Sequence, residues 1–210
     1  MQRIFITGTG TQVGKTIISA IVTESLQADY WKPVQAGFED GTDLLTVKGL
    51  ISNRVTTVHP EIYRLSLAAS PHIAAREESM KIRIEDILRQ VPVTKRPLII
   101  EGAGGIMVPL NENEFVLDLV TTLDAGVIIV SKNELGSINH SLMTAAMIKS
   151  RHIQKAAWIF NNSFMDYEHE IIAWSGFPKI GSIPYLSQIT PATISEQGQI
   201  LYPALQHFLC

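Results

Sequence analysis

Short apolar runs alternate with longer segments of helical periodicity along the whole chain. The first run, at residues 3–7, is β-branched and aromatic, and the apolar residues at 17–22 behind it continue for the length of a helix. The runs are nearly continuous rather than alternating, which is typical of buried parallel strands. Further strands are predicted at 30–34, 98–100, 127–130, 157–160 and, more weakly, 180–183, and helices at 43–50, 84–91, 116–123, 137–150, 166–174 and 195–208. The pattern predicts an α/β fold, a parallel sheet with helices on both faces.

The length of the chain bounds the number of domains. Its 210 residues are enough to bury a substantial core, and we find no internal repeat or low-complexity segment. Residues 52–60 form the most irregular insertion. We therefore expect a single domain that spans residues 1–210.

Charge and cysteine content narrow the class of partner. The formal net charge is -3 and there is no basic run, so nothing favours nucleic acid or an anionic membrane over a small metabolite. The one cysteine, Cys210, suits a reducing compartment, and we interpret it as an incidental thiol. No signal-like start or apolar run near the ~20 residues of a membrane span is present. We expect a cytoplasmic protein.

Residues 8–16 read GTGTQVGKT and join the first predicted strand to the first predicted helix. A helix N-terminus leaves backbone N–H groups unpaired and carries a partial positive charge, which suits phosphate oxygens. In a phosphate-binding loop, Lys15 would reach the β- and γ-phosphates, and the Thr16 hydroxyl would ligate Mg²⁺. Five residues separate Gly8 from Gly14, where the usual motif has four. The loop is thus a variant phosphate-binding loop, and a plain turn is the alternative.

Two charged residues stand where predicted strands end, which is where ligands of open parallel sheets collect. Lys32 lies within WKPVQAG, and an edge lysine that reaches toward water is the alternative to a functional lysine. Glu101 begins EGAGG, and its carboxylate can bind Mg²⁺ across from Thr16. A helix-capping or salt-bridged glutamate is the alternative there.

Two predicted helices begin with residues typical of N-caps. On local grounds Thr42 or Asp43 is an ordinary N-cap. Ser137 is cap-like in the same way, and the helix N-terminus at this point can capture a second anion, such as a substrate carboxylate. His72 has no Cys or His companion at ligand spacing, so we interpret it as structural rather than as a metal ligand.

The segments GTGTQVGKT, WKPVQAG, GTDLL, SPHIAA, EGAGG, LGSINHSLMTA and IPYL follow one another along nearly the whole chain. In this order and at these intervals they resemble the dethiobiotin synthetase family. The resemblance implies a P-loop-containing fold and an ATP- and Mg²⁺-dependent ligase. Its reaction would be the carboxylation and ring closure of 7,8-diaminopelargonic acid with CO₂, which forms the ureido ring of dethiobiotin in biotin biosynthesis and releases ADP and phosphate. The resemblance also implies a homodimer with shared active sites.

The resemblance further implies a role for each matching residue. Lys32, Lys15 and Thr11 would be catalytic, and Thr16, Asp43 and Glu101 would bind Mg²⁺, which overrules the capping interpretation of Asp43. ATP would contact Gln12, Val13, Gly14, Lys15, Thr16, Ile17, Asp43, Glu101, Gly102, Ala103, Gly104, Asn161, Pro184 and Tyr185, with adenine at Asn161. The substrate would contact Ala36, Gly136, Ser137, Ile138 and Asn139, with its carboxylate at the last four. The chemistry supports these roles, because each intermediate is anionic and is stabilised by cations and helix N-termini without a protein nucleophile.

Two positions depart from the family pattern, and one other class of protein competes. Gly10 stands where an acidic residue is frequent, and Ala36 stands where some members have a serine near the substrate. A partition-type P-loop ATPase shares the fold and the variant loop, but it usually has a second lysine early in the loop and a basic membrane-binding helix. The C-terminal residues 200–210 have no basic amphipathic face. A cobyrinate-amidating relative would normally carry an additional glutaminase domain.

Overall fold

The computed structural model describes residues 2–39 and 41–210. Within this described part, seven strands form one sheet in the order β4-β2-β6-β1-β7-β8-β9, and each strand runs parallel to its neighbours. Their bounds are β1 Arg3–Gly8, β2 Asp29–Trp31, β4 Val58–His59, β6 Leu98–Gly105, β7 Gly126–Lys132, β8 Ala156–Asn161 and β9 Lys179–Ile183. Because β6 lies between β2 and β1, the carboxyl ends of these three strands meet at one edge of the sheet.

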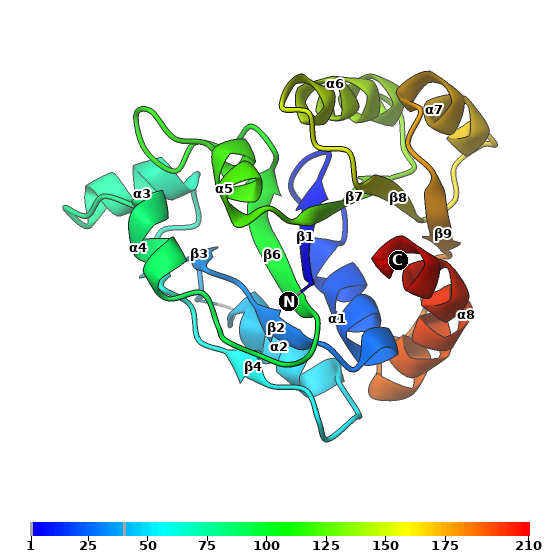
Figure 1. The fold of residues 1–210 in the computed structure, drawn as a ribbon, viewed down its shortest axis with the longest axis horizontal. Coiled ribbons are helices and arrows are strands. Elements are labelled where there is room, and N and C mark those ends of the chain that lie inside the picture. The colour runs from blue at the N-terminus through cyan, green and yellow to red at the C-terminus, as the bar shows by residue number, and fades with distance from the viewer. Residues whose placement is uncertain (1, 40) are drawn as a thin grey trace.

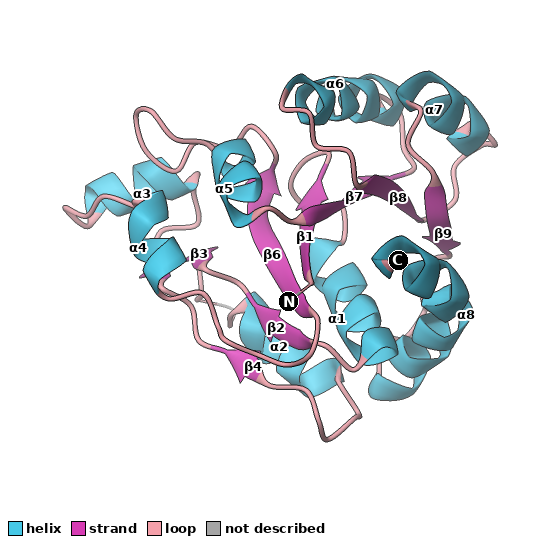
Figure 2. Cartoon of the chain, viewed as in Figure 1, coloured by secondary structure: helices cyan, strands magenta, loops and turns pink. Residues whose placement is uncertain are grey.

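Helices cover both faces of the sheet (Figures 1 and 2). One face packs against α1 (Lys15–Leu26), α2 (Asp43–Leu50) and α8 (Pro191–Leu209). The other packs against α3 (Pro71–Glu77), α4 (Ile84–Arg89), α5 (Val116–Leu123), α6 (Ser137–Ser150) and α7 (Glu168–Ser175). This architecture confirms the predicted α/β class.

The continuous apolar runs are explained by a sheet that is buried on both sides. Along β1, Ile4 and Ile6 face the core beneath α1, while Phe5 between them faces the opposite core. Burying each such side chain contributes roughly 1.5–3 kcal/mol. In the β1–β6 register, Ile6 pairs with Glu101, so the apolar strand carries this carboxylate to the edge of the sheet beside the phosphate loop.

The strand predicted at 30–34 is confirmed only in part, because it is interrupted at Lys32 and Pro33. β2 ends at Trp31, and Val34–Ala36 (β3) pairs with Tyr63–Leu65 (β5) in a separate two-stranded sheet. Proline has no N–H to donate to a ladder. The Pro33 carbonyl accepts hydrogen bonds from Ile62 and Tyr63 at 2.9 and 3.0 Å, which turns the chain out of the main sheet.

Other differences concern short elements and helix ends. Sequence periodicity missed β4, β5 and α3, which are two, three and seven residues long. The start of α3 has proline at its first position, where a missing N–H is tolerated. The last helix likewise begins at Pro191 rather than at 195, after the Thr190 cap.

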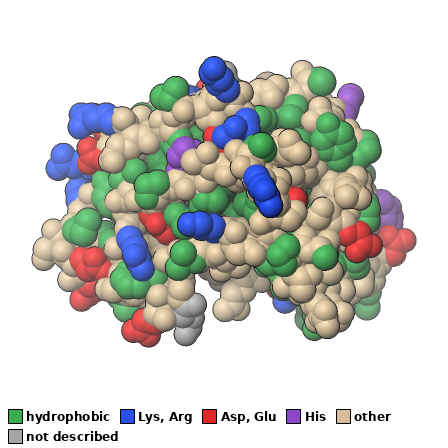
Figure 3. Space-filling view, turned by 90° about the horizontal axis from the view of Figure 1, so that it is seen from below, with side chains coloured by type: hydrophobic (Ala, Val, Ile, Leu, Met, Phe, Trp, Pro, Cys, Tyr) green, Lys and Arg blue, Asp and Glu red, His purple; other side chains and the backbone are tan. Residues whose placement is uncertain are grey.

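Charged groups of both signs are interspersed on the face drawn in Figure 3. A search of the described residues finds no helix that is both long and apolar enough to cross a membrane.

Candidate active site

The GTGTQVGKT loop curls over the start of α1, and glycine is required at two of its positions. Gly14, the N-cap of α1, has φ +96°, and a Cβ there would lie 2.3 Å from Asn161 Nδ2. A Cβ on Gly8 would lie 2.6 Å from Val13 Cγ2. A Cβ on Gly10 would meet no described atom within 4 Å, so crowding does not explain glycine at that position. The loop is therefore compact and delivers the N-terminus of α1 to the edge of the sheet.

Lys15 folds back over the loop. Its Nζ donates to the Gly10 carbonyl at 2.9 Å, and the side chain is buried. Burial lowers the pKa of Lys15 to about 8, although the charge of Glu101 opposes this shift; nearby Lys32 acts in the same direction as burial. The ammonium group thus lies where an anion would stabilise its charge.

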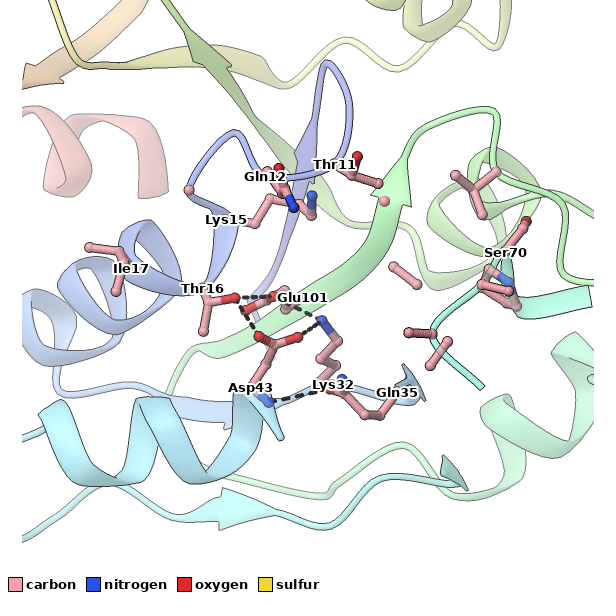
Figure 4. Close-up of a pocket in the computed structure, with 18 residues that line it drawn as sticks. Thr11, Gln12, Lys15, Thr16, Ile17, Lys32, Gln35, Asp43, Ser70 and Glu101 are labelled. Carbon is pink, nitrogen blue, oxygen red and sulfur yellow. Dashed lines mark hydrogen bonds and ion pairs between the residues drawn. The ribbon is translucent and has the colours of Figure 1, made fainter. Parts of the chain in front are cut away.

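Thr16 lies between two carboxylates that come from different elements (Figure 4). Its Oγ1 is 2.8 Å from Asp43 Oδ1 and 3.0 Å from Glu101 Oε1. A hydroxyl has one hydrogen and can donate to only one of them at a time. Thr42 is the N-cap of α2, accepting from the Leu45 N–H, so the side chain of Asp43 remains available to the site.

Lys32 provides the counter-charge for both carboxylates. Its Nζ donates to Glu101 Oε1 at 3.0 Å and to Asp43 Oδ2. Burial alone would lower the pKa of Lys32, but the charges of Glu101 and Asp43 outweigh burial and raise it. Burial likewise opposes the charge of Asp43, and Lys32 overcomes it to lower the pKa of that carboxyl. The edge-lysine alternative is wrong, because β2 lies inside the sheet and Lys32 is 5% exposed.

Tyr30 and Gln35 support this cluster, and the sequence analysis missed both. The Tyr30 hydroxyl donates to Glu101 Oε2 at 2.9 Å, and burial, followed by the charge of Glu101, raises the pKa of Tyr30 well above its usual value. Gln35 Oε1 accepts from the Asp43 N–H at 3.3 Å. The sequence held a partial signal for Tyr30, because it precedes Lys32 by two residues in the strand predicted at 30–34 and residues two apart on a strand share a face.

The floor of a cleft of about 770 Å³ is formed by Thr16, Lys32, Gln35, Asp43 and Glu101. Its wall opposite the phosphate loop comes from Ala68–Pro71, which the sequence analysis did not include (Figure 4). Most of the predicted site residues line the cleft: Thr11, Gln12, Gly14, Lys15, Thr16, Ile17, Lys32, Ala36, Asp43, Glu101, Ala103 and Gly104. Val13 and Gly102 do not line it, since Val13 is buried beneath the loop and Gly102 packs on the Phe5 ring.

The residues predicted at adenine lie outside this cleft. Asn161 ends β8, and its Nδ2 donates to the Val13 carbonyl at 2.9 Å, which ties the strand to the phosphate loop. Pro184 and Tyr185 follow β9, the strand next to β8, and Tyr185 is exposed.

The residues 136–139 do not reach the cleft of their own chain. The N-cap of α6 is Gly136 and not Ser137. Glycine suits this position, because its φ of +91° lies in the left-handed region. Ser137 is instead buried within the first turn, with its Oγ 2.6 Å from the Tyr167 hydroxyl. Further along α6, Met143 and Met147 line a second cavity of about 300 Å³ on another side of the phosphate loop.

The sequence is similar to those of known proteins along most of its length. The profile of a family described as "AAA domain" matches residues 2–193. The "ATP-dependent dethiobiotin synthetase BioD" of Cytophaga hutchinsonii is 49% identical over 173 residues, covering 82% of each chain. The protein of the same name from Christiangramia forsetii is 44% identical and covers 88% of this chain and 86% of its own. This chain belongs to the dethiobiotin synthetase family.

Solved structures show where the fold recurs outside the dethiobiotin synthetases. A ParA family ATPase from Chlorobium tepidum has a TM-score of 0.60 at 14% identity, covering 100% of this chain and 98% of its own. The MinD cell division protein of Aquifex aeolicus has a TM-score of 0.56 at 15% identity, with 100% and 94% covered. These likenesses show the fold alone, and the identity to the dethiobiotin synthetases favours that family over the partition-type alternative.

Proposed function

We propose that this protein is an ATP-dependent dethiobiotin synthetase. It would form the ureido ring of dethiobiotin from 7,8-diaminopelargonic acid, CO₂ and ATP, with the whole chain as one synthetase domain. The observation that carries the proposal is the buried Lys32, which lies beside the hydroxyl and carboxylates of Thr16, Asp43 and Glu101 under a phosphate-binding loop. We assign the reaction to the cytoplasm, because the single cysteine, Cys210, suits a reducing compartment.

The phosphate loop would hold the triphosphate of ATP. The start of α1 offers unpaired backbone N–H groups, and Lys15 has a lowered pKa that an anion would restore. Asn161 would contact adenine, since its Nδ2 is already bonded to the loop and its Oδ1 remains as an acceptor for the exocyclic amine. Pro184 and Tyr185 would lie beside the base.

The residues around Thr16 fit a magnesium ion. One hydroxyl and two carboxylates meet within hydrogen-bond distance, and hard oxygen donors of this kind are what Mg²⁺ prefers. Thr16, Asp43 and Glu101 would therefore hold the ion. When bound, Mg²⁺ supplies positive charge to the phosphate oxygens during phosphoryl transfer.

The reaction needs cations more than it needs a nucleophile from the protein. One substrate amine adds to CO₂ and loses a proton, which gives a carbamate. A carbamate oxygen takes the γ-phosphoryl group and ADP leaves. The second amine then attacks the carbamate carbon and loses a proton, and phosphate departs as the ring closes. Lys32 and Lys15 would stabilise these anions from the cleft floor and the loop, with Thr11 at the rim.

A second copy of the chain would complete the substrate site. Residues 136–139 lie away from the cleft of their own chain, and α6 carries an apolar cavity, with Met143 61% exposed. In a homodimer, the N-terminus of α6 from one subunit would receive the substrate carboxylate that extends from the cleft of the other. Ala36 would contact the substrate within the cleft.

ATP hydrolysis measured with and without 7,8-diaminopelargonate and bicarbonate tests the proposal. A synthetase should release ADP only when both are present. Equal ADP release without either compound would contradict the proposal and favour a nucleotide switch.

A further inference from the structure

The buried Tyr30 hydroxyl contacts the site only through Glu101. Tyr30 is wholly buried in the core beneath α1 and α2, and Glu101 is 1% exposed. Tyr30 pairs with Ile99 in the β2–β6 register, two residues before Glu101. The ring therefore runs along the sheet toward the carboxylate, and its hydroxyl donates to Oε2 at 2.9 Å.

This hydrogen bond divides the two oxygens of Glu101 between different partners. Oε2 accepts from Tyr30, whereas Oε1 faces Thr16 and Lys32 at 3.0 Å each. Asp43 differs, because among the described residues its two oxygens face only Thr16 and Lys32, and its side chain is 31% exposed. The orientation of the deeply buried carboxylate is thus fixed from inside the core.

We propose that Tyr30 is a positioning residue that keeps Glu101 Oε1 directed at the cation site. The inference rests on the proposed function, because the cation is Mg²⁺. Without the hydroxyl, Oε2 becomes a buried acceptor without that donor, and the carboxylate can rotate to give both oxygens to Lys32. Lys32 would then compete with the metal ion for Glu101.

The experiment compares Tyr30→Phe with Tyr63→Phe. Tyr63 is a matched control, because it is also buried and its hydroxyl lies 3.2 Å from a carboxylate oxygen of Asp86, outside the cleft. Calorimetry would measure the Mg²⁺ concentration that half-saturates each protein in the presence of ADP. Loss of an outer partner of a metal ligand weakens metal binding by about 10-fold or more, so Tyr30→Phe should need about 10-fold more Mg²⁺. Thermal unfolding without metal would measure how much folding stability each variant loses with its tyrosine hydroxyl, so that this loss can be separated from a change in Mg²⁺ binding.

The Mg²⁺ requirements of the wild type and the two variants test the positioning role of Tyr30. A raised Mg²⁺ requirement in Tyr30→Phe alone supports the positioning role, and equal requirements in all three proteins overturn it while leaving the synthetase proposal intact. A wild-type protein that binds ADP without any dependence on Mg²⁺ overturns both. If Tyr30→Phe does not fold, 4-aminophenylalanine and 4-methylphenylalanine in place of Tyr30 fill similar space and differ in the donor. Equal Mg²⁺ requirements in that pair would also overturn the inference.

Discussion

Lys32→Ala should separate the two tasks of this lysine, because Mg²⁺ can replace one of them only. Its Nζ lies between Asp43 and Glu101, so its removal leaves two carboxylates around Thr16 without their counter-charge. A divalent cation can restore positive charge at that point. It cannot restore an ammonium group at the reacting carbamate. We expect the variant to be less stable than the wild type without metal, to regain most of that stability with it, and to be inactive in both conditions.

The structure sets the size of each effect. Removing one partner of a buried ion pair costs about 3–5 kcal/mol of unfolding free energy. Because the Asp43 side chain is 31% exposed and Glu101 only 1%, we expect about 3 kcal/mol, the lower end of that range. In a chain of this length the loss lowers Tm by about 6–12 °C. Magnesium at about 100 times its dissociation constant returns about 2.7 kcal/mol. Turnover should fall about 100-fold or more.

Thermal unfolding with EDTA and with Mg²⁺, together with dethiobiotin formation, measures all three quantities. Lys48→Ala is the control, since Lys48 is an exposed lysine on α2. Near-normal turnover in Lys32→Ala would refute the catalytic role. An unchanged Tm in EDTA would refute the charge pairing.

Three further predictions follow from the same geometry. Burial lowers the pKa of Lys15 to about 8, and bound phosphate should raise it again. ATP binding should therefore take up a proton near pH 8 and weaken as the pH rises further. Calorimetry in buffers of different ionisation enthalpy measures this proton uptake, which Lys15→Met should abolish. Asp43→Asn and Glu101→Gln should each raise the Mg²⁺ concentration for half-maximal activity, since amides are poorer ligands; an unchanged titration in both would favour a capping or ion-pairing role. The Lys15→Ala and Asn139→Trp variants should each be inactive alone and should recover roughly a quarter of wild-type activity when co-expressed. Half of the dimers are then mixed, and each mixed dimer has one intact site and one damaged site. No recovery, with mixed dimers shown to be present, would contradict shared sites.

The sequence predicted the fold and the floor of the cleft because both depend on local patterns. Apolar runs report burial on both faces of the sheet, and the phosphate loop is set by glycines near one another in the chain. The carboxyl ends of β2 and β6 meet at one edge, so Lys32 and Glu101 could be expected near Thr16.

The partners of these residues were not predictable in the same way. That Tyr30 reaches Glu101 depends on the β2–β6 register, which pairs Tyr30 with Ile99 and which periodicity does not determine. Gln35 reaches the Asp43 N–H only because the chain leaves the main sheet at Pro33 and forms β3. Each contact joins elements whose relative placement no local pattern encodes.

The most direct test of the synthetase proposal is the product itself. Purified protein would be incubated with Mg²⁺, ATP, 7,8-diaminopelargonate and ¹³C-bicarbonate, and the products measured by mass spectrometry alongside ADP. We predict dethiobiotin with ¹³C in the ureido carbon and one ADP released for each ring formed. ATP consumption without labelled dethiobiotin would contradict the proposed function.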